Sequence, residues 1–329
     1  MSKQGKGVAA RATACLCALV YAATALAADP YPAKPVRVVA PFAPGGGTDT
    51  VARVLAQQFA DQLGKSFIVD NRTGASGMIA YEIVAKAAHD GHTLLITNSA
   101  FASLPALMKS LPYDPVKSFT PVSEILRAPN VLVVHPSTNV TTVKDFIAAA
   151  RANPGKFNYG SGGAGSALHL YGELFKIAAK ADLTHVPYKG GGDNMAALLS
   201  GQIHMNITQY QANVIALIKA GRLRALAVTT DGKRSPALPD VPSMSEAGLH
   251  GMTIYAWAGL LAPAGLPKNI LARLHGEVTK MLTVPAVRER FTAQDAELIG
   301  SRPEVFAQLL QSEIARWGSV IRAAGIQAN

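Results

Sequence analysis

The sequence predicts an α/β fold of two domains joined by two crossover segments. One observation is a repeated unit: a buried strand, a glycine-rich loop and a helix occur at residues 36–59 and again at residues 157–177. The other is length, because a chain of about 300 residues usually divides into two hydrophobic cores. Strands that alternate with helices between these units favour right-handed crossovers and a mainly parallel sheet.

The first residues have the pattern of a secretory signal peptide. Three basic residues precede an uncharged, alanine-rich apolar segment at residues 12–26, and a small-x-small cleavage pattern ends it. We assign residues 1–27 to the signal peptide and expect cleavage after about Ala27 and export to the periplasm. An uncleaved anchor is the alternative, but the segment is short for a membrane span and no other apolar run approaches that length.

Composition argues against several kinds of function. Both cysteines, Cys15 and Cys17, lie in the predicted leader, so the mature chain has no thiol for a disulfide or a thiolate metal site. The formal net charge is +10, and the leader removes three positive charges and no negative one, which leaves +7. A moderate positive charge favours anionic ligands, whereas scattered basic residues and few aromatics argue against nucleic acid as a partner.

The first unit can bind an anion. Residues 36–39 predict a buried strand, prolines and glycines at residues 41–47 predict a loop, and apolar residues recur at helical spacing from Val51. Glycines let backbone N–H groups converge, and a helix N-terminus adds unpaired donors and the positive end of its dipole, which suits a carboxylate, sulfate or phosphate. The alternative is a simple tight turn with Thr48 or Asp49 as the helix cap.

The remaining elements alternate along the chain. In the first domain, strands are expected at residues 67–70 and 93–97, and the polar pair Asn98 and Ser99 follows the second of them. Ligands of open α/β sheets bind beyond the carboxyl ends of the strands, so this pair and the loop at Gly45 are expected on one edge. Other elements are expected at residues 78–88, 131–134, 142–152, 184–188, 194–199, 203–207, 223–229, 270–282 and 303–324.

The domain limits follow from the repeat. The sequence contains no long linker, so we expect two crossings between the domains, near Val131 and near Ala227. We predict that residues 28–129 and 231–329 form the first domain and that residues 130–230 form the second.

Catalytic and cofactor motifs are incomplete in this chain. The spacing Gly160-x-Gly162-x-x-Gly165 matches the dinucleotide fingerprint, but the next strand ends at Tyr188 and Lys189 where the fingerprint needs an acid. An exported protein also has little access to NAD. The dinucleotide interpretation is therefore disfavoured.

A nucleophile and base pair is also weakly supported. Ser166 and His169 share a helix face at i, i+3, yet no acid is placed by sequence to orient the imidazole, so a packing role is expected for His169. His89 and His92 flank the turn signal Asp90-Gly91, and no two histidines have the i, i+4 spacing of a helical metal site. We expect no catalytic residue, no metal and no cofactor.

Two anion-competent loops remain, one in each predicted domain. If the carboxyl edges of the two sheets face each other, both helix N-termini point into one cleft, and a small anion is held from both sides. Hinge closure around a ligand is how periplasmic binding proteins work.

Several motifs occur in one order over essentially the whole mature chain. They are Pro41-Phe-x-Pro-Gly-Gly-Gly-Thr-Asp49, Tyr159-Gly-Ser-x-Gly-x-Gly-Ser166-x-x-His169-Leu170, Pro187-Tyr-Lys-Gly190 and Trp257-x-Gly-Leu-x-Ala-Pro263. In these motifs the chain resembles the substrate-binding proteins of tripartite tricarboxylate transporters, called TctC or Bug proteins.

The resemblance implies two α/β domains around a cleft and a small organic carboxylate as ligand, delivered to the membrane subunits of a transporter. It also implies that two strand–loop–helix hairpins hold the ligand. Carried onto this chain, the ligand-binding residues are Phe42, Ala43, Gly45, Gly46, Gly47, Thr48, Asp49, Asn98, Ser99, Ser161, Gly162, Ala164, Gly165, Ser166, Lys189 and Asp193.

Two departures from the family pattern affect ligand choice. Asp193 stands where the family often has proline, and Thr73 and Ser76 replace proline and glycine in a further glycine-containing loop at residues 71–77. Facing the cleft, Asp193 would repel a second ligand carboxylate; the alternative is a helix cap that points to solvent. Asp49, beside an anion site, is assigned to helix capping and loop rigidity.

We therefore expect an exported, monomeric solute-binding protein that closes on a carboxylate without catalysis. One alternative is an exported sensor subunit that presents such a ligand to a signalling partner. Another is an exported hydrolase or oxidoreductase that uses the loop at residues 160–166.

Overall fold

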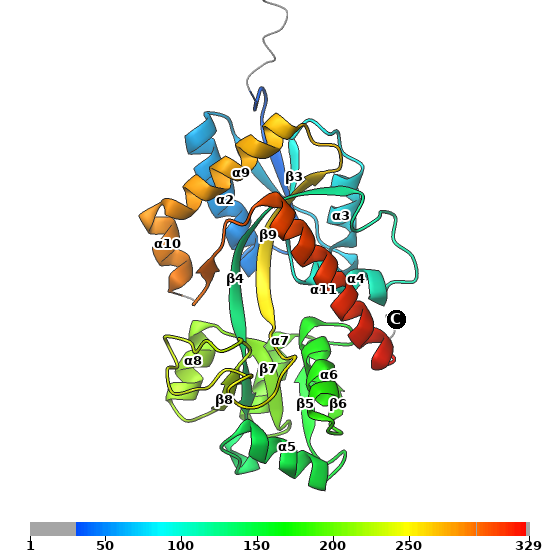
Figure 1. The fold of residues 1–329 in the computed structure, drawn as a ribbon, viewed down its shortest axis with the longest axis vertical. Coiled ribbons are helices and arrows are strands. Elements are labelled where there is room, and N and C mark those ends of the chain that lie inside the picture. The colour runs from blue at the N-terminus through cyan, green and yellow to red at the C-terminus, as the bar shows by residue number, and fades with distance from the viewer. Residues whose placement is uncertain (1–30, 294, 327–329) are drawn as a thin grey trace, which may run out of the picture.

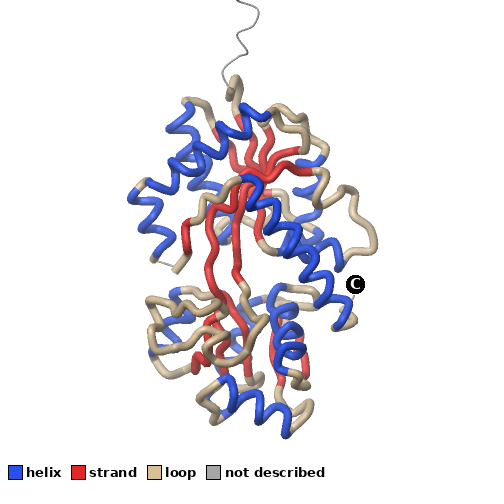
Figure 2. Tube along the Cα trace, viewed as in Figure 1, coloured by secondary structure: helices blue, strands red, loops and turns tan. Residues whose placement is uncertain are grey.

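The chain forms two lobes that strands β4 (Phe119–Val134) and β9 (Tyr255–Pro263) connect (Figure 1). The computed structural model describes residues 31–293 and 295–326, so the predicted signal peptide lies outside the described residues. In each lobe the strands lie inside and helices cover them (Figure 2). The predicted α/β class is therefore confirmed.

Lobe 1 contains a mixed sheet. Strands β1 (Val36–Ala40), β2 (Phe67–Asn71) and β3 (Thr93–Asn98) run parallel in the order β2-β1-β3. Strand β9 is antiparallel to β3 and to the first half of β4, and the short β10 (Glu297–Leu298) also pairs with β4. The helices of this lobe are α2 (Gly47–Leu63), α3 (Met78–Ala85), α4 (Ala100–Leu107), α9 (Lys268–Thr283), α10 (Pro285–Thr292) and α11 (Pro303–Ala323), and a 3₁₀ turn, η1 (Ala75–Gly77), precedes α3.

Lobe 2 is built on the second half of β4. This half pairs antiparallel with β7 (Met205–Gln209) and β8 (Arg224–Val228), whereas β5 (Asn158–Ser161) is parallel to β7 and to β6 (Thr184–Pro187). The helices of this lobe are α5 (Val143–Ala152), α6 (Ala167–Ala179), α7 (Gly191–Leu199) and α8 (Ala212–Lys219), and a 3₁₀ turn, η2 (Pro136–Thr138), precedes α5.

The junction between the lobes differs from the predicted parallel sheet. The strands that follow the repeated units are parallel, but β4 and β9 are antiparallel to each other, because one leads the chain into lobe 2 and the other brings it back. Strand β4 has 16 residues, of which the sequence predicted only residues 131–134. Pro121 and Pro129 weaken the strand pattern, and the strand accommodates Pro121 beside a register shift.

The strand registers bring the carboxyl ends of the parallel strands face to face. Asn98, the last residue of β3, pairs with Ala258 near the start of β9. Gln209, the last residue of β7, pairs with Asn130, where β4 exchanges β9 for β7 as its neighbour. Since β1 is parallel to β3, and β5 is parallel to β7, the ends of β1 and β5 point toward the opposite lobe.

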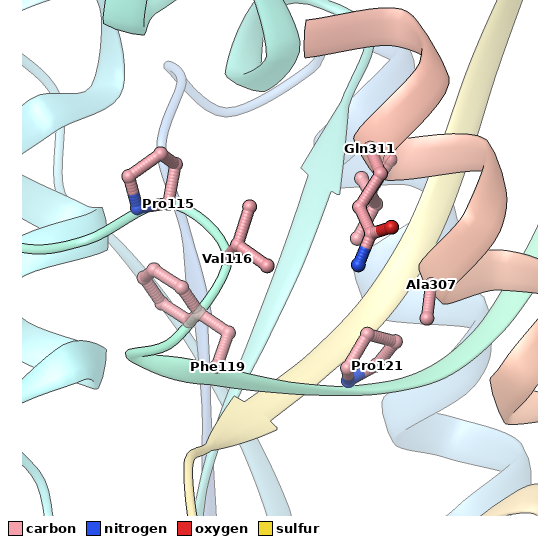
Figure 3. A pocket seen from close by; sticks show the side chains of 7 residues that line it. Pro115, Val116, Phe119, Pro121, Ala307 and Gln311 are labelled. Atoms are coloured by element: carbon pink, nitrogen blue, oxygen red, sulfur yellow. The ribbon is translucent and has the colours of Figure 1, made fainter. Parts of the chain in front are cut away.

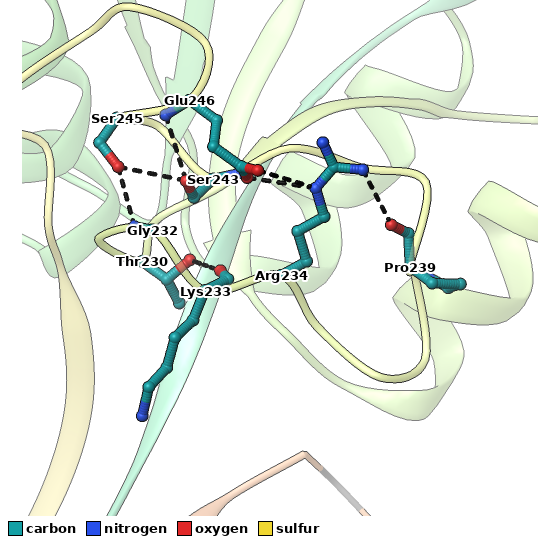
Figure 4. A network of polar contacts seen from close by, with 8 residues as sticks. All are labelled: Thr230, Gly232, Lys233, Arg234, Pro239, Ser243, Ser245 and Glu246. Carbon is teal, nitrogen blue, oxygen red and sulfur yellow. Dashed lines mark hydrogen bonds and ion pairs between the residues drawn. The ribbon is translucent and has the colours of Figure 1, made fainter.

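Residues 231–254 remain with lobe 2. The Val228 N–H donates to the Pro242 carbonyl at 2.9 Å, and the Met244 N–H donates to the Val228 carbonyl at 2.9 Å. Arg234 binds the Glu246 carboxylate in the polar network of this segment (Figure 4). The return crossing thus lies next to Tyr255, where β9 begins, and differs from the position near Ala227 expected from sequence.

The lobes contact each other on two sides of the crossing. On one side, α11 descends from lobe 1 toward α6, and the rings of Trp317 and Tyr171 lie 5.7 Å apart (Figure 1). On the other side, the Ser235 hydroxyl of lobe 2 donates to Asp295 at 2.6 Å, and Lys233 lies 3.5 Å from Glu297. Both contacts join segments that are far apart in sequence.

Candidate functional site

The glycine loop of lobe 1 connects β1 to α2. Gly46 is the N-cap of α2, no side chain caps the helix, and the first helical bond runs from the Thr50 N–H to the Gly46 carbonyl at 2.9 Å. The N–H groups of Gly47, Thr48 and Asp49 therefore precede the helical ladder. A Cβ atom at Gly46 would meet only the Ala43 carbonyl at 3.6 Å. The start of α2 thus has free backbone donors and open space. The prediction that Thr48 or Asp49 caps this helix is wrong, because Gly46 is the N-cap and no side chain caps the helix.

Asp49 fastens this loop. Its carboxylate is 3% exposed and accepts hydrogen bonds from the Gly45 N–H at 2.9 Å, from Arg53 at 2.8 Å and from the Asn71 amide at 2.9 Å. Burial alone would raise the pKa of Asp49, but these hydrogen bonds and the Arg53 charge hold it below its usual value. Asp49 is thus a paired carboxylate that rigidifies the loop.

The third predicted loop is tied to the first. The Asn98 amide donates to the Thr48 hydroxyl at 2.9 Å, and its carbonyl oxygen accepts from the Ala100 N–H at 3.0 Å. Ser99 is the N-cap of α4 and is half-buried. Phe42 is half-buried, and its carbonyl accepts from the Asn71 amide at 2.9 Å. Lobe 1 therefore brings Phe42, Thr48 and Asn98 together at one sheet edge.

The glycine loop of lobe 2 has the same plan. Ser166 is the N-cap of α6 without a side-chain cap, and its carbonyl accepts the first helical bond from Leu170 at 3.0 Å. The N–H groups of Ala167, Leu168 and His169 precede the helical ladder. The Ser166 hydroxyl oxygen is buried and has no hydrogen-bond partner among the described residues. This loop contacts lobe 1, since a Cβ at Gly165 would lie 3.1 Å from Leu107 of α4.

Two histidines hold the lobe-2 loop. The Gly165 N–H donates to His169 Nδ1 at 2.9 Å, and the Ser161 hydroxyl lies 2.7 Å from His185 Nε2. The sequence predicted only a packing role for His169, and this hydrogen bond was missed. The i, i+4 spacing of Gly165 and His169 was the signal that could have suggested it. Because Nδ1 accepts from the Gly165 N–H and the Ser166 hydroxyl contacts neither His169 nor another polar group of the described residues, these two side chains do not form a nucleophile and base pair in this structure.

The loop after β6 lies beside the lobe-2 glycine loop. A Cβ at Gly162 would be 3.7 Å from the Gly190 backbone. Lys189 is exposed, and Asp193 is an exposed residue in the first turn of α7, whose N-cap is Gly190 without a side-chain cap. Asp193 is therefore no helix cap, and its charge complements the helix dipole.

Gly160, the first glycine of the dinucleotide fingerprint, is explained by helix packing. A Cβ at Gly160 would lie 2.0 Å from the Asn194 side-chain oxygen of α7, so only glycine allows α7 to pack on β5. Ala164, in contrast, is exposed in the middle of the loop.

Sequence reasoning missed the residues at the end of β7. Gln209 and Gln211 are exposed beside the crossing, and the Gln211 amide donates to the Gln209 side chain at 2.9 Å. The strand was expected to end at residue 207, and two glutamines after a strand have no recognisable motif. They lie on the facing edge with Ser161.

Two cavities lie away from these loops. One of about 90 Å³ is apolar and lies between the segment at Pro115 and α11 (Figure 3). Another of about 260 Å³ is lined by residues of lobe 2 that include Pro136 and Arg224. Neither is lined by a predicted ligand-binding residue.

Residues 31–293 and 295–326 contain no group of three or more histidine, cysteine, aspartate or glutamate side chains placed to hold a metal ion. No helix in the same ranges is both long and apolar enough to cross a membrane.

Comparisons with known proteins agree with the motifs. Residues 51–326 match the family profile described as "Tripartite tricarboxylate transporter family receptor", TctC. The chain is 37% identical to protein BugT of Bordetella pertussis over 305 residues. This matched region covers 92% of this chain and 93% of BugT.

Solved structures extend the comparison. A Rhodopseudomonas palustris protein solved with adipate is 38% identical, with a TM-score of 0.75 over 91% of this chain and 100% of the other. MatC of the same organism, with bound malate, is 36% identical, with a TM-score of 0.73 over 88% and 100%. The fold is that of a two-domain periplasmic binding protein with a ligand cleft between its domains. The resemblance is confirmed, and the chain belongs to the TctC family of tripartite tricarboxylate transporter receptors.

Proposed function

We propose that this protein captures a small organic carboxylate between its lobes and delivers it to the membrane subunits of a tripartite tricarboxylate transporter. The observation that carries the proposal is the facing pair of helix N-termini, α2 in lobe 1 and α6 in lobe 2, at the ends of β1 and β5. Each contributes backbone N–H groups ahead of its helical ladder, and such groups bind anions.

The polar groups around these helix starts suit a carboxylate. The Ser166 hydroxyl has no partner among the described residues, and the Thr48 hydroxyl and Asn98 amide lie at the corresponding edge of lobe 1. Asp49 adds little repulsion, because Arg53 and two further donors are paired with it. The relatives solved with adipate and malate support a ligand of this class.

The proposal includes the form in which the protein works. We place the leader cleavage after Ala27 and expect a periplasmic monomer without a cofactor or catalytic residue. We also place the domain limits at the two crossings, near residue 130, where β4 exchanges β9 for β7, and near residue 254, just before β9 begins. All sixteen ligand-binding residues predicted from sequence stay in the proposal, with Asp49 in a structural role and with Gln209 added.

Thermal unfolding of the purified, exported protein tests the proposal. The panel contains adipate, malate, citrate, amino acids, sugars and NAD. A ligand at a hundred times its dissociation constant adds about 2.7 kcal/mol of stability, which raises Tm by several degrees. We expect carboxylates to stabilise the protein and sugars to have no effect. Stabilisation by NAD alone would overturn the proposal and restore the dinucleotide interpretation of the Gly160 loop.

A further inference from the structure

The lobe-2 glycine loop is attached at both ends to a stacked pair of imidazoles. Gly165, near its end, donates its N–H to His169 Nδ1 at 2.9 Å, and Ser161, at its start, lies 2.7 Å from His185 Nε2. The two imidazole rings are 3.8 Å apart and nearly parallel, at 7°. Both ends of the loop thus contact one pair of stacked side chains.

The bond to Gly165 requires one protonation state. A backbone N–H can donate to His169 Nδ1 only while that nitrogen carries no proton. A protonated Nδ1 would face the Gly165 N–H with a second donor, so the loop would have to move. Protonation of either ring also places a positive charge against its stacked neighbour.

The surroundings of the pair disfavour protonation. Burial lowers the pKa of His169, and burial with the neighbouring His169 lowers the pKa of His185 to about 4. Glu173 opposes this effect on both rings, but its carboxylate is already bonded to the Tyr159 hydroxyl at 2.6 Å and to Lys176 at 3.0 Å.

The elements that follow β6 or pack against α6 carry further charged groups. Lys189 and Asp193, after β6, are exposed. On α11, which packs against α6, Arg316 and Glu313 pair with each other. Glu173 and Lys176 are therefore the charged side chains that act on both rings.

We propose that His169 is a positioning residue of the lobe-2 loop, whose unprotonated Nδ1 holds Gly165 in place, and that protonation of the His169–His185 pair releases the loop and weakens carboxylate binding. The effect on binding rests on the proposed function. The effect on the loop does not, because it occurs in the protein without ligand.

The test follows the Gly165 amide by NMR in the ligand-free exported protein between pH 8 and pH 4. We expect the Gly165 resonance to shift with the same midpoint as the His169 ring protons. The variant His169→Asn keeps an acceptor near the position of Nδ1 but cannot titrate, so its Gly165 resonance should stay constant. In His169→Ala the resonance should resemble the acid form at every pH.

His204 provides a matched control. It is a partly buried histidine of the same lobe, its Nδ1 lies 3.1 Å from the Asn158 backbone nitrogen and 2.7 Å from the Asn158 side-chain oxygen, and burial lowers its pKa. His204→Asn should leave the Gly165 titration unchanged. A Gly165 resonance that does not titrate in the native protein, or that still titrates in His169→Asn, would overturn the inference.

Binding of adipate supplies the second measurement. The ratio of the dissociation constants of the native protein and His169→Asn at each pH cancels the ionisation of adipate itself. We expect this ratio to rise at least tenfold between pH 7.5 and the acid end of the titration. A constant ratio contradicts the binding part of the inference. If no carboxylate of the unfolding panel binds at pH 7.5, the proposed function fails, while the Gly165 titration still decides the role of His169.

Discussion

In lobe 1 the glycine loop is fastened by a charged side chain, Asp49, whereas in lobe 2 two neutral imidazoles, His169 and His185, fasten the equivalent loop. Both loops follow a buried strand and end at a helix start without a side-chain cap. The two loops therefore share a backbone arrangement, but different kinds of side chain rigidify them.

The two loops avoid electrostatic repulsion between a bound anion and the side chains that hold the loop in two different ways. A carboxylate beside a bound anion is tolerated only when it is paired, and Asp49 is paired with Arg53, the Gly45 N–H and Asn71. Neutral imidazoles bring no repulsion, but His169 Nδ1 accepts the Gly165 hydrogen bond only while that nitrogen is unprotonated. We therefore expect lobe 1 to be insensitive to pH from neutrality down to mild acid, and lobe 2 to respond.

The largest expected effect comes from filling either loop. Gly46→Val and Gly162→Val should each weaken adipate or malate binding at least a hundredfold, about 2.7 kcal/mol. Neither glycine has a positive φ, and the Cβ added at each meets nothing closer than 3.6 Å, so the fold should survive. Isothermal titration calorimetry measures the affinity.

Gly276→Val is the matched control for these variants. Gly276 lies in α9, where an added Cβ meets nothing within 4 Å. Binding by this control should be unchanged. If only one of the two loop variants loses affinity, the ligand is held by one lobe, and the comparison between the loops fails as an account of binding.

The next prediction compares the stability lost on removing buried Asp49 with that lost on removing its exposed partner Arg53. Asp49→Ala should lower the free energy of unfolding by about 1–3 kcal/mol, because it leaves the Gly45 N–H without its acceptor. Arg53→Ala should cost at most about 1 kcal/mol, since the Arg53 side chain is 56% exposed. Urea unfolding at pH 7 measures both. Equal costs would mean that the ion pair, and not the bond to the loop, stabilises lobe 1.

The smallest effect is the pH dependence of stability without ligand. The unfolded chain protonates its histidines below about pH 6.5, whereas folded His185 has a pKa of about 4. Stability should be complete above pH 6.5 and fall by about 1–2 kcal/mol by pH 5, since each such histidine contributes at most about 1.4 kcal/mol per pH unit.

Asp49 also stabilises less as the pH falls, but in a more acid range than His185. The pKa of Asp49 is lowered in the folded protein, so its contribution is present above the unfolded value of 3.8 and is lost only at more acid pH. Urea unfolding at pH 7.5, 6.5 and 5 should therefore show a smaller decline in His185→Gln, while Asp49→Ala keeps the native slope. A native slope in His185→Gln would contradict the role given to the imidazoles.

Local sequence was sufficient for much of the fold. Valine-rich strands and helical periodicity predicted β1, α2 and α6. It failed for α4, which contains Pro105, and for the first half of β4, which contains Pro121 and Pro129. In these elements tertiary pairing overrides a weak local preference.

By itself, the sequence determined the two strand–loop–helix units, their order and the family, because glycine content, β-branching and motif spacing are local properties of the chain. Only the tertiary structure decided which side chains fasten the loops. Asn71 reaches Asp49 because β2 lies beside β1, with Asn71 opposite Ala40, and His185 reaches Ser161 because β6 lies beside β5, with His185 opposite Tyr159. Strand neighbours and register depend on packing between distant segments, and no local pattern in the sequence specifies them.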